Sequence, residues 1–164
     1  MSTTTHDGFT QSYAKSETRA LTATDWGLLA LRLAVGVIFF MHGSQKVLGW
    51  FGGHGLSATV TGMSQMGIPL FLAYIASFTE FLGGLGLLFG VLARLSSLGI
   101  FVVMAVAVLK VHLANGFFMN WMGNQKGEGY EYHLMVMAIT LMVFLTGPGR
   151  IALADVEAKW LKKK

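Results

Sequence analysis

Four runs of apolar residues, separated by short polar stretches, dominate the hydropathy pattern of the chain. They cover residues 26–48, 68–92, 95–115 and 130–145. A helix needs about 20 mostly apolar residues to cross the hydrocarbon core of a bilayer. The second and third runs reach this length, the first does so if His42 and Lys46 are included, and the fourth is short. The pattern predicts an all-α fold, a membrane-spanning four-helix bundle.

Polar or amphipathic segments flank these runs. Residues 1–25 contain no long apolar run and no signal-peptide pattern, so we interpret them as a cytoplasmic tail, with Thr24 or Asp25 as the cap of the first helix. Residues 150–164 combine apolar positions with lysines, which is typical of an amphipathic segment on the inner leaflet. The membrane domain is therefore expected to span residues 26–149.

Smaller features complete the expected bundle. Within the glycine-punctuated loop 49–67, apolar residues recur at helical spacing at Leu56, Val60 and Met63. This spacing predicts a short interfacial helix. Gly86 and Gly90 have the small-xxx-small spacing that allows helices to pack closely.

Composition supports the membrane interpretation and excludes several functions. Hydrophobic residues make up 54% of the 164 residues and charged residues only 12%, against about 25% in soluble domains. The absence of cysteine excludes disulfide chemistry, cysteine-ligated iron–sulfur clusters and c-type haem attachment. No flavin or phosphate-binding motif and no basic-aromatic stripe for nucleic acid is present. The net charge of +4 therefore indicates topology and contact with the lipid bilayer.

The basic residues are distributed unevenly along the chain. Those that we expect on one side of the membrane are Lys15, Arg19, Arg94, Arg150, Lys159 and Lys162–Lys164. In the connections between the first and second runs and between the third and fourth runs, Lys126 is the only lysine or arginine, and Lys46 lies at the end of the first run. The positive-inside rule then places both termini in the cytoplasm.

Two charged residues lie well inside the membrane runs, away from their outer ends, where hydrocarbon makes a charge costly. Glu80 is near the middle of the second run, and Arg32 lies about two turns from the start of the first. We expect Arg32 to pair with Glu80, either as a structural salt bridge or as part of a proton or ligand site. Glu80 is the candidate catalytic residue at this depth.

A second polar group is expected near the outer face, where three helices reach the same depth. Its members are His42, Lys46, Lys110, His112, Glu131 and His133. We expect the three histidines to face one shared cavity, with Glu131 and the backbone orienting the rings, because hydrocarbon offers an imidazole no hydrogen-bond partner. Aromatic residues surround this level, so a plainer interpretation is an interfacial aromatic belt.

Two ligands compete for this histidine group. A quinone is the first, because an imidazole can donate to a quinone carbonyl while aromatic rings pack against the head group. A metal ion held by histidines from three helices is the weaker alternative, since no His-x-x-His or His-x-x-x-His spacing supports it. His42 and His112 are the candidate catalytic residues of the quinone site.

Five stretches between Leu31 and Asp155 resemble the DoxX family. They are LRLAVGVIFFMHGSQKVLGWFGG, MGIPLFLAYIASFTEFLGGLGLLFGVLARL, VHLANGFFMNW, GYEYHL and GPGRIALAD. The resemblance implies a small four-helix protein of the bacterial inner membrane, related to the large subunit of an archaeal thiosulfate:quinone oxidoreductase. The family pattern falls on the residues already selected as cofactor-binding, namely Arg32, His42, Lys46, His112, Glu131 and His133, and on Glu80.

Three functions follow from these observations. The first is a quinone-linked subunit of a membrane oxidoreductase, which needs a redox partner because the chain has no flavin, haem or iron–sulfur motif. The second is a structural or accessory subunit of a larger membrane complex, without chemistry of its own. The third, a proton path through Glu80, would need a homo-oligomer because four helices make a thin wall.

Overall fold

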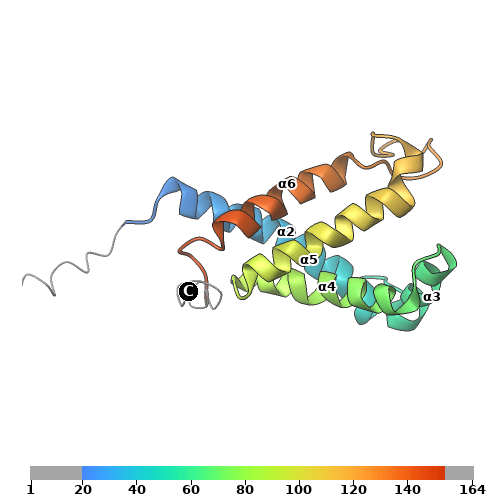
Figure 1. Cartoon of the computed structure of the whole chain (residues 1–164), viewed down its shortest axis with the longest axis horizontal. Coiled ribbons are helices and arrows are strands. Elements are labelled where there is room, and N and C mark those ends of the chain that lie inside the picture. The colour runs from blue at the N-terminus through green and yellow to red at the C-terminus, as the bar shows by residue number, and fades with distance from the viewer. Residues whose placement is uncertain (1–19, 154–164) are drawn as a thin grey trace, which may run out of the picture.

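The computed structural model describes residues 20–153, and this part of the chain is an all-helical bundle (Figure 1). Its long helices are α2 (Ala23–Val47), α4 (Leu70–Phe89), α5 (Ala93–Ala107) and α6 (Glu131–Thr146). Within residues 20–153, three stretches are long and apolar enough to cross a membrane, and the shorter α6 is also apolar. The all-α membrane fold is thus confirmed. The predictions for residues 1–19 and 154–164 lie outside the described residues.

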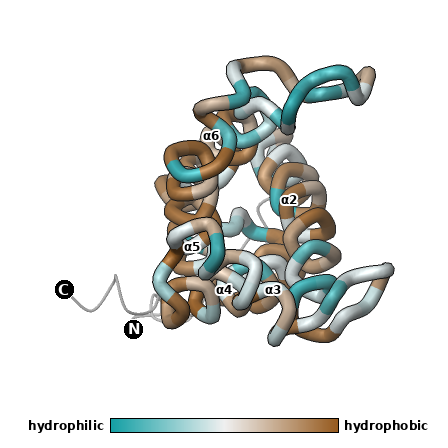
Figure 2. Tube along the Cα trace, turned by 90° about the vertical axis from the view of Figure 1, so that its right-hand side faces the viewer, coloured by the Kyte–Doolittle hydropathy of each residue, from teal (hydrophilic) through white to brown (hydrophobic). Residues whose placement is uncertain are grey.

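The helices pack in chain order, α2 on α4, α4 on α5 and α5 on α6. Viewed end-on, these helices are arranged around a common centre (Figure 2). Hydrophobic residues predominate along the helices, and many of the hydrophilic residues lie in the loops. We call the end with α3 (Gly55–Gln65) and residues 116–130 the loop end, and the end with residues 20–22, 90–92 and 147–153 the terminal end. Large side chains point outward, such as Phe71 and Leu145, each 64% exposed, as lipid contact requires.

The first helix starts earlier than the sequence predicted. Thr22 is its cap, and the Thr22 side chain accepts a hydrogen bond from the Asp25 backbone N–H. The Asp25 carboxylate accepts in return from the Thr22 backbone N–H at 2.8 Å. This reciprocal capping box satisfies two amides of the first turn, so the expectation that Thr24 or Asp25 caps the helix was wrong.

The interfacial helix expected within loop 49–67 is present as α3. It runs from Gly55 to Gln65 and buries Val60, which is 3% exposed, against the bundle. Leu56 and Met63 are half-buried on the same face. The apolar spacing in the sequence therefore identified both the helix and its inward side.

Glycines set the close approach of α2 and α4. A Cβ atom on Gly43 would lie 2.3 Å from the Phe81 backbone, and one on Gly84 would lie 2.3 Å from the Phe40 backbone. One on Gly36 would meet Leu88 at 2.9 Å. These contacts fix the antiparallel register of the two helices. Gly86 and Gly90 also pack closely, as their spacing predicted, but against different neighbours. Gly86 faces Ser96 on α5, and Gly90 faces Arg32.

We expect Gly84→Ala to destabilise the bundle by about 1–3 kcal/mol, because the added methyl group has only backbone to displace. The measurement is the detergent-solubilised protein's unfolding midpoint in an SDS titration. Gly62→Ala is the matched control, because nothing lies within 4 Å of a Cβ there. Equal midpoints for the two variants would refute the close packing at Gly84.

Candidate functional site

A cavity of about 430 Å³ lies in the loop-end half of the bundle, between α2, α3, α4, α5 and α6. Ligand sites typically have volumes of about 300–1,000 Å³. Most of its wall is apolar, and its polar lining comes from His42, Lys46, Glu80, His112, Tyr132 and His133. We call this space the site cavity. It contains the three histidines that the sequence analysis expected around one cavity, whereas Arg32 and Glu131 do not line it.

Lys46 and Glu80 form a salt bridge across the wall of the site cavity. The crossing of α2 and α4 at Gly43 brings the last turn of α2 beside the middle of α4. The Glu80 side chain is 4% exposed, and that of Lys46 is 26% exposed. The pair leaves the cavity wall without net charge at this point, which suits a neutral polar ligand.

The expected pair of Arg32 with Glu80 was wrong. The antiparallel register places Arg32 beside the end of α4, about three turns from Glu80. The Arg32 guanidinium donates instead to the carbonyl oxygen of Leu87, at 3.3 Å, and to that of Ile151. Arg32 is 1% exposed and holds the C-terminal end of α4 to the segment that follows α6. The sequence could not reveal the true partners of Arg32. It indicates how deep a residue lies along its own helix, but not the register between α2 and α4.

His112 enters the site cavity from a distortion of the third membrane helix. α5 continues into η1 (Val108–His112), a π-helical turn, and then into η2 (Leu113–Asn115), a 3₁₀ turn. A π turn rotates the residues that follow it, and such turns are frequent at functional sites. The His112 Nδ1 atom lies 2.8 Å from the Glu128 carbonyl oxygen. Because a carbonyl only accepts, Nδ1 carries the proton, and Nε2 of the neutral ring is an acceptor.

His133 packs against His112, with 4.1 Å between the ring centroids. It is 6% exposed, and its Nδ1 atom has no hydrogen-bond partner among residues 20–153. His42 lines the same cavity from α2, but it is an exposed residue and lies at the edge of the cavity. The three histidines therefore line one cavity but are shielded to different degrees.

Glu131 does not orient the histidine rings, contrary to expectation. Its carboxylate accepts a hydrogen bond from the Met119 backbone N–H at 2.8 Å, which fixes the loop before α6. Asn115 supports the same loop by donating its side-chain amide to the Glu128 carbonyl oxygen at 3.0 Å. Glu131 and Asn115 thus hold the loop whose carbonyl orients His112.

The rest of the lining of the site cavity is apolar or aromatic. No group of three or more His, Cys, Asp or Glu side chains within residues 20–153 could hold a metal. The apolar wall includes Phe39, Met63 and Met104, which pack well against flat or flexible hydrocarbon. Tyr132 is one of the aromatic residues expected around this level, and it lines the cavity beside His133.

Comparisons with known proteins agree with this architecture. One relative, named "Putative oxidoreductase CatD", is from Bacillus subtilis (strain 168) and is 32% identical over 127 residues, covering 77% of this chain and 84% of that protein. Another, named "Inner membrane protein YqjF", is from Escherichia coli (strain K12) and is 28% identical over 137 residues, covering 83% of this chain and 96% of that protein.

No solved structure matches the chain significantly. The DoxX family model matches residues 27–113, which include most of α2 and all of α3, α4, α5 and η1. These residues contribute most of the wall of the site cavity. The match covers more than half of the sequence, and the chain belongs to the DoxX family of membrane proteins.

Proposed function

We propose that this chain is the quinone-binding membrane subunit of an oxidoreductase system, with the quinone head group in the site cavity. The observation that carries the proposal is the set of polar groups that line a largely apolar cavity inside a membrane bundle. A quinone head group is flat and neutral, with carbonyl oxygens at its rim. It needs this combination of apolar walls and a few convergent polar groups.

His112 is the residue best prepared for proton exchange with such a ligand. The Glu128 carbonyl holds the proton on Nδ1, so Nε2 of the neutral ring can accept a hydrogen bond from a quinol hydroxyl. A ring protonated on both nitrogens would instead donate to a quinone carbonyl. Lys46 presents an ammonium group to the same cavity, and Glu80 holds that group in place.

The electrons must come from or go to a partner. The chain contains no cysteine and no flavin or haem motif, so we propose that a second redox subunit supplies the electron carrier. The name of the Bacillus relative supports an oxidoreductase context, and that of the Escherichia relative supports the inner membrane. With both termini in the cytoplasm, as the basic residues favour, the site cavity lies toward the outer leaflet.

We expect His112→Ala to weaken binding of a benzoquinone to the detergent-purified protein by about tenfold, because one oriented hydrogen bond is lost. Quench of tryptophan fluorescence measures the binding. His54→Ala is the control, since His54 is an exposed residue before α3 and does not line the site cavity.

Two results would contradict the proposal. One is a protein that neither retains quinone after extraction of its lipids nor binds added benzoquinone. The other is equal binding by the His112→Ala and His54→Ala variants. A stoichiometric partner recovered without quinone would support the alternative of an accessory subunit without chemistry of its own.

A further inference from the structure

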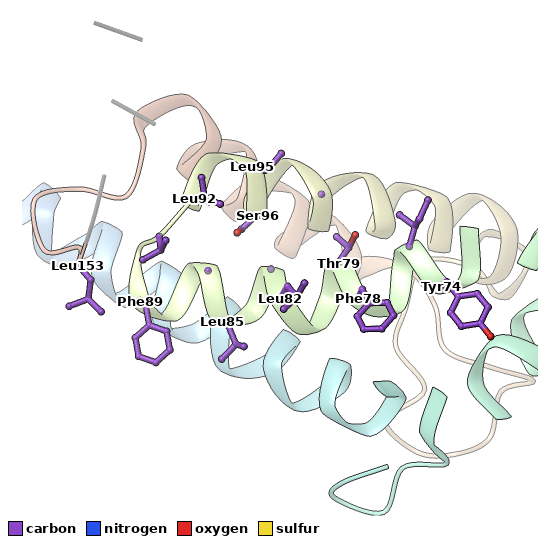
Figure 3. A pocket seen from close by; sticks show the side chains of 15 residues that line it. Tyr74, Phe78, Thr79, Leu82, Leu85, Phe89, Leu92, Leu95, Ser96 and Leu153 are labelled. Carbon is purple, nitrogen blue, oxygen red and sulfur yellow. The ribbon is translucent and has the colours of Figure 1, made fainter. Parts of the chain in front are cut away.

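A second hollow runs along the outside of the bundle, between α4 and α5. It has a volume of about 960 Å³ and is open along its length. Figure 3 shows its side chains in a row, with Tyr74 toward one end and Phe89 and Leu153 at the other. The hollow thus reaches from the loop-end half of the bundle to the terminal end. We call it the α4–α5 groove.

The α4–α5 groove is lined by hydrocarbon. Among residues 20–153, no charged side chain lines it, and Thr79 and Ser96 carry the only hydroxyl groups besides that of Tyr74. Its floor contains glycines, and its rim carries large exposed side chains such as Leu82, which is 57% exposed, and Leu95, which is 59% exposed. Small side chains cover these glycines, since Ser96 lies over Gly86 and Thr79 over Gly99. A low floor of small residues between bulky walls makes a channel that fits a slender apolar chain.

The groove and the site cavity share a wall residue. Ile75 lines both spaces, and it is 57% exposed on the outer surface of α4. Val102 and Val106 on α5 also line the site cavity, and they are 51% and 41% exposed. Accessible residues from both α4 and α5 therefore border the cavity on this side. In Figure 1, α4 and α5 lie together at their shared turn and diverge toward the loop end.

From the shared residue Ile75 and the divergence of the two helices we propose that the α4–α5 groove holds the polyprenyl tail of a quinone whose head group occupies the site cavity, and that the ligand enters sideways from the bilayer at Ile75. The inference rests on the proposed function. From Ile75 to Phe89 the groove follows about 21 Å of helix, which is enough for several isoprenoid units. The head group in the cavity and the opening at Ile75 together fix where the tail begins.

The test compares two forms of the same benzoquinone, one without a tail and one polyprenylated, bound to the purified protein in detergent. We expect the polyprenylated form to bind at least about tenfold more tightly, since the tail leaves detergent for a fitted apolar surface. Leu82→Trp fills the groove but does not touch the site cavity. It should remove most of the advantage of the tail and leave binding of the tailless form unchanged.

Two further variants complete the design. Ile75→Trp narrows the opening and should slow association of the polyprenylated form more than that of the tailless form. Met135→Trp is the control, because Met135 is 60% exposed on α6 and lines neither space. Thermal unfolding of each variant in detergent verifies that the bundle is folded before binding is compared.

The outcomes separate the two proposals. If the tailless form binds and depends on His112, but the tail adds nothing and Leu82→Trp binds both forms as the parent does, the groove inference is wrong and the proposed function stands. The groove would then belong to a phospholipid chain or a second copy of the protein. If neither form binds, both proposals fail.

Discussion

Lys46→Met is expected to destabilise the bundle by about 3–5 kcal/mol, because it leaves the Glu80 carboxylate unpaired at 4% exposure inside a membrane domain. Glu80→Gln should cost less, because the Lys46 side chain is 26% exposed and its ammonium can reach water more easily. Unfolding midpoints in an SDS titration of the purified protein measure both effects.

The double variant Lys46→Met with Glu80→Gln tests whether the two residues act as a pair. We expect it to be more stable than Lys46→Met alone, since no uncompensated charge is left in the cavity wall. Lys126→Met is the control for a lysine changed in the same way on an exposed loop, and it should shift stability by less than about 0.5 kcal/mol. Strictly additive losses in the double variant would show that the salt bridge contributes nothing.

Arg32→Met is expected to have the second largest effect, about 2–4 kcal/mol. The Leu87 carbonyl belongs to the last turn of α4, where helix carbonyls lack partners, and Arg32 satisfies it together with Ile151. Removing the guanidinium leaves both acceptors without this donor at the terminal end, although it also removes the cost of burying a charge. Unfolding midpoints in an SDS titration measure the net change in stability that results from these two effects.

Two comparisons make this result specific to the position. Arg32→Lys should recover only part of the loss, because an ammonium group does not reproduce the fork of the guanidinium. Arg150→Met changes an exposed arginine at the same end of the bundle, whose guanidinium donates to the Ala20 carbonyl oxygen at 3.1 Å, and should be nearly neutral. If Arg32→Met behaved like Arg150→Met, Arg32 would not hold α4 to the chain after α6.

Gly90 explains why the Arg32 side chain fits so tightly. A Cβ atom at Gly90 would lie 2.1 Å from an Arg32 terminal nitrogen and 2.6 Å from the Ala152 Cβ atom. The residue also has a φ of +70°, which ends α4 in the left-handed conformation that glycine adopts without strain. The sequence marked Gly90 as a packing glycine but could not show that its neighbour is a buried arginine.

In the candidate site, too, the sequence indicated some features and only the structure revealed others. Charge in an apolar run identified Glu80, and depth along the helices brought His42, His112 and His133 to one level, because both arguments need only the helix rise and the cost of burial. The π turn at η1 left no signal in the sequence, since its hydrogen-bond shift depends on neighbouring helices and on the loop that meets His112.

The sequence by itself determined the all-α membrane class, the extents of the helices to within a few residues and the amphipathic helix α3, because hydropathy and its period are local properties of the chain. The tertiary structure decided which partner each buried charge has. The glycine contacts at Gly36, Gly43 and Gly84 set one register between α2 and α4, and that register gave Glu80 to Lys46 rather than to Arg32. Register depends on contacts between residues far apart in the chain, so a pattern along one helix cannot contain it.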